Sequence, residues 1–178
     1  MQTLSYILSI LGLISMITAS LIKGRDMRKI LFFVFCGNFL VATSYLIGGS
    51  GINGAAACYL GGIQSIINYF FDSKNKPLPT WLIVVYATAI IVLNIVVAGG
   101  VTWLGLLVIV ASLTFILCIG QKNGAKYRFW TIVNMVFWCT YDVLSKSFGA
   151  LITHAVQILF AVVGMLVNDM KFSKTEKV

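Results

Sequence analysis

The sequence predicts an all-α transmembrane protein of seven helices, and three observations predict it. The 178 residues are 60% hydrophobic and only 10% charged, which leaves too little polar surface to cover a soluble globule. Seven apolar runs divide the chain, and each has roughly the twenty residues that a helix needs to cross a bilayer. Most basic residues lie in alternate gaps between these runs. Lipid is therefore the first predicted partner of the chain.

Each apolar run is long and continuous enough to form a membrane-spanning helix. The predicted helices cover residues 4–22, 30–48, 53–71, 80–98, 101–120, 129–144 and 149–167. A barrel strand would be about half as long and would alternate polar with apolar residues, which these runs do not. Helices are then the remaining structure that satisfies its own backbone hydrogen bonds in lipid.

The basic residues predict the orientation of the helices. Of the 13 lysines and arginines, the gaps after the first, third, fifth and seventh runs hold all but Lys146: Lys23, Arg25, Arg28, Lys29, Lys74, Lys76, Lys122, Lys126, Arg128, Lys171, Lys174 and Lys177. The positive-inside rule places these gaps in the cytoplasm, with the amino terminus outside and the carboxyl terminus inside. The net charge of +8 follows from this topology, so no nucleic-acid partner is implied.

The polar residues within the runs indicate an internal repeat. At an offset of 96 residues Asn38 matches Asn134 and Tyr45 matches Tyr141, and shortening the next loop by three residues matches Gln64 with Gln157. The predicted organisation is a first three-helix repeat over residues 1–76, a linker helix over 77–99, a second repeat over 100–170 and a basic tail over 171–178. Because three helices and a linker make an even number, both repeats enter the membrane in the same direction. This 3+1+3 arrangement of parallel repeats is found among transporters.

The polar residues of the last two helices also make the chain resemble a known family. A basic loop precedes a helix with Trp138, Tyr141 and Asp142, and residues 146–149 then lead into a helix that carries Gln157. This pattern is similar to the YgjV-like family of bacterial inner-membrane proteins, and the repeat resembles the SWEET, PQ-loop and PnuC superfamily of transporters. The resemblance implies a bacterial inner-membrane location and a transporter-like fold.

Polar side chains inside a bilayer are candidate functional residues, because burying them in lipid without a partner is costly. If the two repeats face each other, their matched amides surround a central space, with the tyrosines and Trp138 about two turns, roughly 10 Å, toward the outside. The predicted substrate-binding residues are Asn38, Tyr45, Gln64, Asn68, Asn134, Trp138, Tyr141 and Gln157. Such uncharged groups suit a neutral polar solute. The alternative is that the amides only join helix to helix.

Two ionisable residues near the predicted outer side are candidates for gating or proton coupling. Asp142 precedes Lys146 by four residues, so an ion pair between them is one interpretation and a proton or cation site is the other. His154, the single histidine, is either a packing residue or a group that couples protons to transport.

The predicted function is an integral membrane transporter, a facilitator or a proton-linked carrier, for a small neutral polar solute such as a sugar, nucleoside or vitamin. The alternative is a non-transporting receptor or assembly subunit that uses the same polar centre. The sequence carries no catalytic, nucleotide-binding or metal-ligand motif, so neither an enzyme, a cofactor nor a metal is expected. Because one chain holds both repeats, we expect the monomer to be the functional unit.

Overall fold

The computed structural model of the chain is built from α-helices throughout the part that it describes, residues 2–23, 26–48, 52–98, 100–146 and 148–169. Seven helices follow one another in these ranges: α1 (Gln2–Leu21), α2 (Met27–Gly48), α3 (Ile52–Ser73), α4 (Thr80–Ala98), α5 (Trp103–Ile119), α6 (Gly124–Leu144) and α7 (Phe148–Gly164). A short π-helical turn, η1 (Met165–Asp169), continues α7. Arg25 and the predicted basic tail, residues 171–178, lie outside the described residues.

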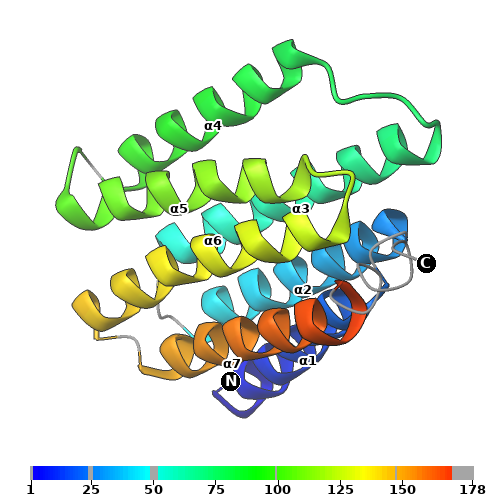
Figure 1. Cartoon of the computed structure of the whole chain (residues 1–178). Coiled ribbons are helices and arrows are strands. Elements are labelled where there is room, and N and C mark those ends of the chain that lie inside the picture. Colours follow the sequence, from blue (N-terminus) through cyan, green and yellow to red (C-terminus); the bar gives the residue numbers. More distant parts are fainter. Residues whose placement is uncertain (1, 24–25, 49–51, 99, 147, 170–178) are drawn as a thin grey trace, which may run out of the picture.

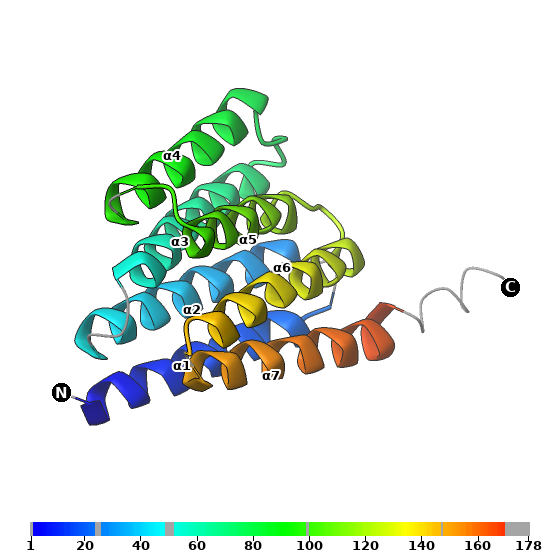
Figure 2. The same cartoon turned by 90° about the vertical axis from the view of Figure 1, so that its left-hand side faces the viewer.

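Six of the helices form a closed ring. α2 packs against α1 and α3, and α6 packs against α5 and α7. The ring closes because α1 contacts α7 and α3 contacts α5. α4 lies outside the ring against α3 and α5, at the edge of the molecule in both views (Figures 1 and 2). The ring therefore encloses a centre to which six helices contribute side chains.

The basic connections gather at one end of this ring. Figure 2 shows the α3–α4 and α5–α6 connections and the end of α7 on the right, with the start of α1 on the left. Arg28 at the start of α2 reaches the end of α3, where its Nε lies 3.6 Å from Oδ2 of Asp72 and a terminal nitrogen donates to Oδ1 of Asn75. We call this the basic end.

The outer surface of the molecule is apolar. On α4 the side chains of Trp81, Val84, Val92 and Val96 are more than half exposed, and its inner side is held by Leu82, Tyr86 and Ile90 against Ile116 of α5. Large exposed apolar side chains of this kind mark a lipid-facing surface. The buried positions, by contrast, include many polar groups, so polarity is concentrated inside.

Length and composition by themselves identify four spans rather than seven in the described part of the chain. They are Gln2–Leu21, Met27–Gly48, Thr80–Val97 and Ala150–Asn168, and the apolar helix Trp103–Ile119 is shorter. α3 and α6 fall outside this set because they carry buried polar groups, among them Gln64 on α3 and Asn134 on α6. Their place in the ring means that these groups face inward, and the crossing of the membrane by all seven helices stays a prediction.

The start of α6 corrects the predicted boundary. The sequence placed the helix at residues 129–144 and left Lys126 and Arg128 in a loop, whereas α6 begins at Gly124 behind an N-cap in which Asn123 accepts from the backbone N–H of Ala125 at 2.8 Å. Arg128 therefore lies within the helix, with its side chain fully buried. A charged residue can join a buried helix turn here because backbone carbonyls of α1 accept its hydrogen bonds.

Candidate functional site

A cavity of about 400 Å³ lies at the centre of the ring. α1, α2, α3, α5, α6 and α7 all contribute to its lining, and Ile90 of α4 reaches it as well. Along α1 the lining runs from Ser5 to Met16, which is about 16 Å of helix. The volume falls within the range of roughly 300–1,000 Å³ that is usual for small-molecule sites.

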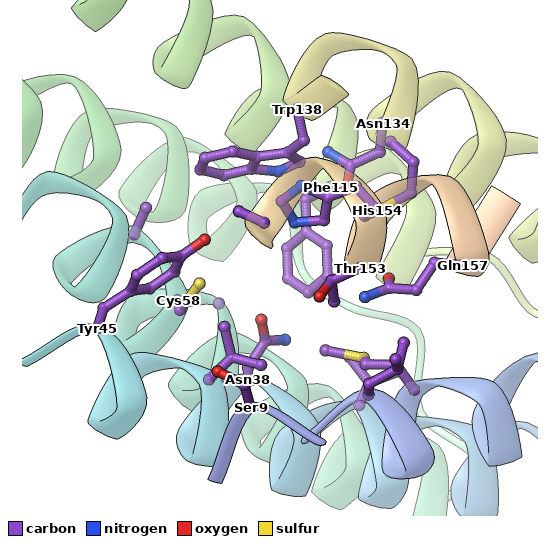
Figure 3. A pocket seen from close by; sticks show the side chains of 18 of the residues that line it. Ser9, Asn38, Tyr45, Cys58, Phe115, Asn134, Trp138, Thr153, His154 and Gln157 are labelled. Carbon is purple, nitrogen blue, oxygen red and sulfur yellow. The ribbon is translucent and has the colours of Figure 1, made fainter. Parts of the chain in front are cut away.

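Three buried amides in this lining have side-chain atoms without a hydrogen-bond partner among the described residues. These atoms are Nδ2 of Asn38, both Nε2 and Oε1 of Gln64, and Oδ1 of Asn134. Gln64 is completely buried. Figure 3 shows Asn38 and Asn134 on opposite sides of the cavity. Because an unpartnered buried polar atom costs about 1–3 kcal/mol, these three amides are candidates for contact with a ligand.

Asn134 is held in one orientation by α5. Its Nδ2 donates to the backbone carbonyl of Ala111 and, at 3.1 Å, to Oγ1 of Thr114. Both amide hydrogens are therefore used, and the carbonyl oxygen remains as an acceptor. The side chain is fixed before any ligand arrives, which lowers the entropic cost of binding.

Aromatic rings form another part of the wall. The indole of Trp138 is buried, and its ring centroid lies 5.7 Å from that of Tyr141 in an edge-to-face contact and 5.6 Å from that of His154 in a tilted contact. Tyr45 and Phe115 also line the cavity (Figure 3). Flat apolar faces next to uncharged amides suit a ring-shaped polar solute.

The structure pairs Asp142 with His154. Nδ1 of His154 lies 2.6 Å from Oδ2 of Asp142, and both side chains are buried. His154 lines the cavity, and Asp142 lies behind it. Lys146, the partner that helical spacing suggested, is exposed, and within the described residues the carboxyl group of Asp142 pairs with His154 instead. The spacing rule does not apply because α6 ends at Leu144, and Lys146 has left-handed backbone geometry (φ 58°).

Six of the eight predicted substrate-binding residues line the cavity: Asn38, Tyr45, Gln64, Asn134, Trp138 and Gln157. Asn68 does not, because its Nδ2 donates to the carbonyl of Ile119 at 3.1 Å and its Oδ1 accepts from the hydroxyl of Tyr86 at 3.2 Å. Tyr141 is also outside the lining and contacts the edge of Trp138. Both were predicted to bind the solute from the pattern of their own helices, whereas neighbouring helices decide which face of a helix meets a cavity.

A group of serines in the lining was not predicted. Ser5 donates to the carbonyl of Ser44 at 2.9 Å, and the hydroxyls of Ser9 and Ser44 lie 2.5 Å apart, so α1 and α2 share a hydroxyl-rich wall. The available signal was the four-residue spacing of Ser5 and Ser9 in an apolar helix, which places both on one face.

The cavity is closed at the basic end. Val34, Cys118 and Tyr127 belong both to the lining and to a packed apolar cluster with Ile30 and Leu31, so they form a floor. At the other end the lining includes Tyr6, which is 68% exposed. The cavity is thus a one-sided vestibule that approaches the surface near the start of α1.

A clamp between three helices lies beyond this floor. Nε of Arg128 donates to the carbonyl of Ser20 at 2.8 Å, and a terminal nitrogen donates to the carbonyl of Ile22. Asn168 of η1 donates to the carbonyl of Leu21 at 2.9 Å. The last carbonyls of α1 therefore receive donors from α6 and from the end of α7, and the arginine charge meets the negative end of the α1 dipole. The sequence had assigned Arg128 only to orientation.

Comparison with known proteins agrees with an inner-membrane setting. A family model described as a bacterial inner membrane protein, Imp-YgjV, matches residues 3–171. The chain belongs to the Imp-YgjV family. No curated protein and no solved structure matches it. The Imp-YgjV chain is accordingly a bacterial inner-membrane protein, in agreement with its apolar helices.

Within the described residues no group of three or more histidine, cysteine or acidic side chains is placed to hold a metal ion. The chemistry that the site offers consists of uncharged hydrogen bonding, aromatic contact and one Asp–His pair.

Proposed function

We propose that this Imp-YgjV protein transports a small neutral polar solute, such as a sugar, nucleoside or vitamin, through the cavity at the centre of its ring. The observation that carries the proposal is the set of unpartnered amide atoms on Asn38, Gln64 and Asn134, which converge on one space from α2, α3 and α6. A solute with hydroxyl or amide groups satisfies both the donors and the acceptors.

The charge of the lining supports a neutral solute. No lysine, arginine, aspartate or glutamate is among the described residues that line the cavity. An ionic solute would bring an unpaired charge into a low-dielectric space, which is costly. A neutral polar solute needs only hydrogen bonds and aromatic faces, both of which the lining supplies.

The shape of the cavity favours transport over the receptor or assembly role. An interior whose amides serve only to join helices would have those amides bonded to one another, whereas Asn38, Gln64 and Asn134 have polar atoms without a partner among the described residues and belong to the lining of a cavity. A vestibule with a floor is the form expected of a carrier that opens to one side at a time. Passage of the solute requires the floor around Val34 and Tyr127 to part.

The arrangement of helices in the ring also supports the proposal of two matched repeats. α1–α3 and α5–α7 would be the two three-helix repeats, with α4 as the linker outside the ring. The contact of α3 with α5 then corresponds to the contact of α7 with α1, as a two-fold axis through the cavity requires. Because both halves belong to one chain, we propose that the monomer is the functional unit.

The test combines binding and uptake. Purified protein is screened by thermal shift against sugars, nucleosides and neutral vitamins, since a ligand that binds the native state raises its stability by about 2.7 kcal/mol at a hundred times Kd. Any hit is then followed in proteoliposomes. Asn38→Leu, Gln64→Leu and Asn134→Leu each remove one or two hydrogen bonds to the solute, so we expect Kd to rise about five- to tenfold or more.

Asn94→Leu is the matched control. Asn94 is a buried amide on α4 whose Nδ2 donates to the carbonyl of Ile90 in its own helix, and its side chain is outside the cavity lining. Its substitution should leave binding and uptake unchanged. Binding and uptake that survive all three cavity substitutions in folded protein would overturn the proposed site. Binding without uptake would instead favour the receptor.

A further inference from the structure

Asp142 and His154 form a buried acid–base pair in the wall of the cavity. Asp142 is only 1% exposed, and its Oδ2 lies 2.6 Å from Nδ1 of His154. The imidazole in turn lies against the indole of Trp138, with their ring centroids 5.6 Å apart. Figure 3 shows Trp138 and His154 side by side at the cavity. An ionisable pair inside a bilayer protein is a candidate proton site.

Other ionisable side chains lie on the elements that pack around the pair. These are Tyr6 of α1, Tyr45 of α2, Cys58 of α3, Cys139 and Tyr141 of α6, and the exposed Lys146 in the turn after α6. His154 is the single titratable side chain of α7. Cys118, at the floor of the cavity, is the single titratable side chain of α5. Tyrosine and cysteine are ordinarily neutral at pH 7 and lysine is charged, whereas histidine is the side chain whose ordinary pKa lies between about pH 5 and 8.

We propose that Asp142 and His154 form the proton-binding site of the carrier and couple proton entry to solute passage. This inference rests on the proposed transport function. A proton carried by hydronium adds to the lone pair on Nε2 of the neutral imidazole and leaves water behind. The Nδ1–H donated to Oδ2 of Asp142 is kept in both states. The net charge of the pair therefore changes from −1 to 0.

This change of charge explains the coupling. A buried carboxylate without a counter-charge is costly wherever water is excluded, whereas an imidazolium–carboxylate pair is neutral overall. Closing the vestibule therefore favours the loaded pair. The imidazole also contacts Trp138, whose indole belongs to the wall that faces the solute. Trp138 therefore connects the proton-binding pair with the solute.

The first experiment observes the proton directly. Because the chain has a single histidine, ¹⁵N-histidine labelling gives the ring nitrogens of one residue, without assignment. In lipid nanodiscs we expect these signals to change reversibly from a neutral ring with hydrogen on Nδ1 to a protonated ring between pH 8 and pH 5. In Asp142→Asn the neutral ring should lose its preference for hydrogen on Nδ1. One unchanging protonation state over this range in folded protein would overturn the proposal.

The second experiment measures coupling in proteoliposomes. The probes are ¹⁴C-labelled glucose, uridine and pyridoxine, with and without an outside-acid pH gradient. For one proton per solute we expect accumulation of up to about tenfold per unit of gradient. Asp142→Asn should make uptake indifferent to the gradient. The matched control is Asp72→Asn, which changes a carboxylate at the basic end that is paired with Arg28. It should keep the gradient dependence.

The outcomes separate the two proposals. If the wild type equilibrates a probe but ignores the gradient, the proton coupling is wrong and the transport function stands. If the wild type moves none of the three probes, transport of these solutes is rejected, and the histidine titration alone decides whether a proton site exists.

Discussion

Gln64 and Asn68 lie one turn apart on α3 and have opposite hydrogen-bonding situations. Both are buried amides in an apolar helix, so the sequence assigns them the same role. Asn68 joins α3 to the end of α5 and to Tyr86 of α4, whereas Gln64 has neither side-chain atom partnered among the described residues. One amide stabilises the fold, and the other is retained at a cost in stability. A buried amide without a partner is a candidate for ligand binding.

This difference predicts the effect of two substitutions on stability. Gln64→Leu removes an unpartnered amide, so we expect the free energy of unfolding to stay the same or to rise by about 1–3 kcal/mol. Asn68→Leu breaks two hydrogen bonds and leaves the Tyr86 hydroxyl without its partner, so we expect a loss of about 1–3 kcal/mol. Thermal melting in one detergent measures both. Equal destabilisation by the two substitutions would contradict this assignment.

At the scale of elements, the close approach of α7, α6 and α1 depends on a glycine. A Cβ at Gly164 would overlap the backbone carbonyl of Ser20 and lie 2.7 Å from Nε of Arg128. Arg128 reaches the end of α1 because α7 presents no side chain at this point. The clamp and the glycine therefore belong to one arrangement that holds the basic end closed.

Gly164→Ala should separate these helices. Because the clash involves backbone as well as the arginine, we expect a loss of about 1–3 kcal/mol or more. Gly62→Ala is the control, since its Cβ meets its nearest neighbour, Cβ of Asn38, at 3.6 Å, an ordinary contact. The control should be neutral or slightly stabilising because alanine favours the helix. Thermal melting compares the two, and a Gly164→Ala protein as stable as the control would show that the clamp is not tightly packed.

At the scale of the whole molecule, a polar centre lies inside an apolar surface. The ring turns the polar faces of α3 and α6 inward and leaves large apolar side chains on the outside. This distribution is the one expected for a protein whose solvent is lipid and whose interior holds a polar ligand. The basic connections lie together at the closed end of the cavity, so the vestibule is predicted to face the outside.

Reporter fusions to the full chain check this orientation. A fluorescent protein after Val178 should fold and fluoresce, while alkaline phosphatase at the same place should be inactive, because the carboxyl terminus is predicted to lie in the cytoplasm. An epitope before Met1 should be accessible to antibody on spheroplasts. The reverse pattern would place the vestibule on the cytoplasmic side and reject the assignment from basic residues.

The sequence by itself determined the helical class, the approximate span of each helix and the inner-membrane family, and six of its eight predicted substrate-binding residues line the cavity. Hydropathy and charge act locally along the chain, so one sequence is enough to detect them. Matched amides such as Asn38 and Asn134 were detectable because polar residues are rare inside apolar helices.

Only the tertiary structure decided which polar group meets which partner. It separated Gln64 from Asn68, paired Asp142 with His154 instead of Lys146, and placed Arg128 inside a helix turn against α1. Each of these outcomes depends on side chains from helices that are far apart in the sequence. Hydrogen bonds act over about 3 Å, so their partners are set by how helices pack and not by spacing along one helix.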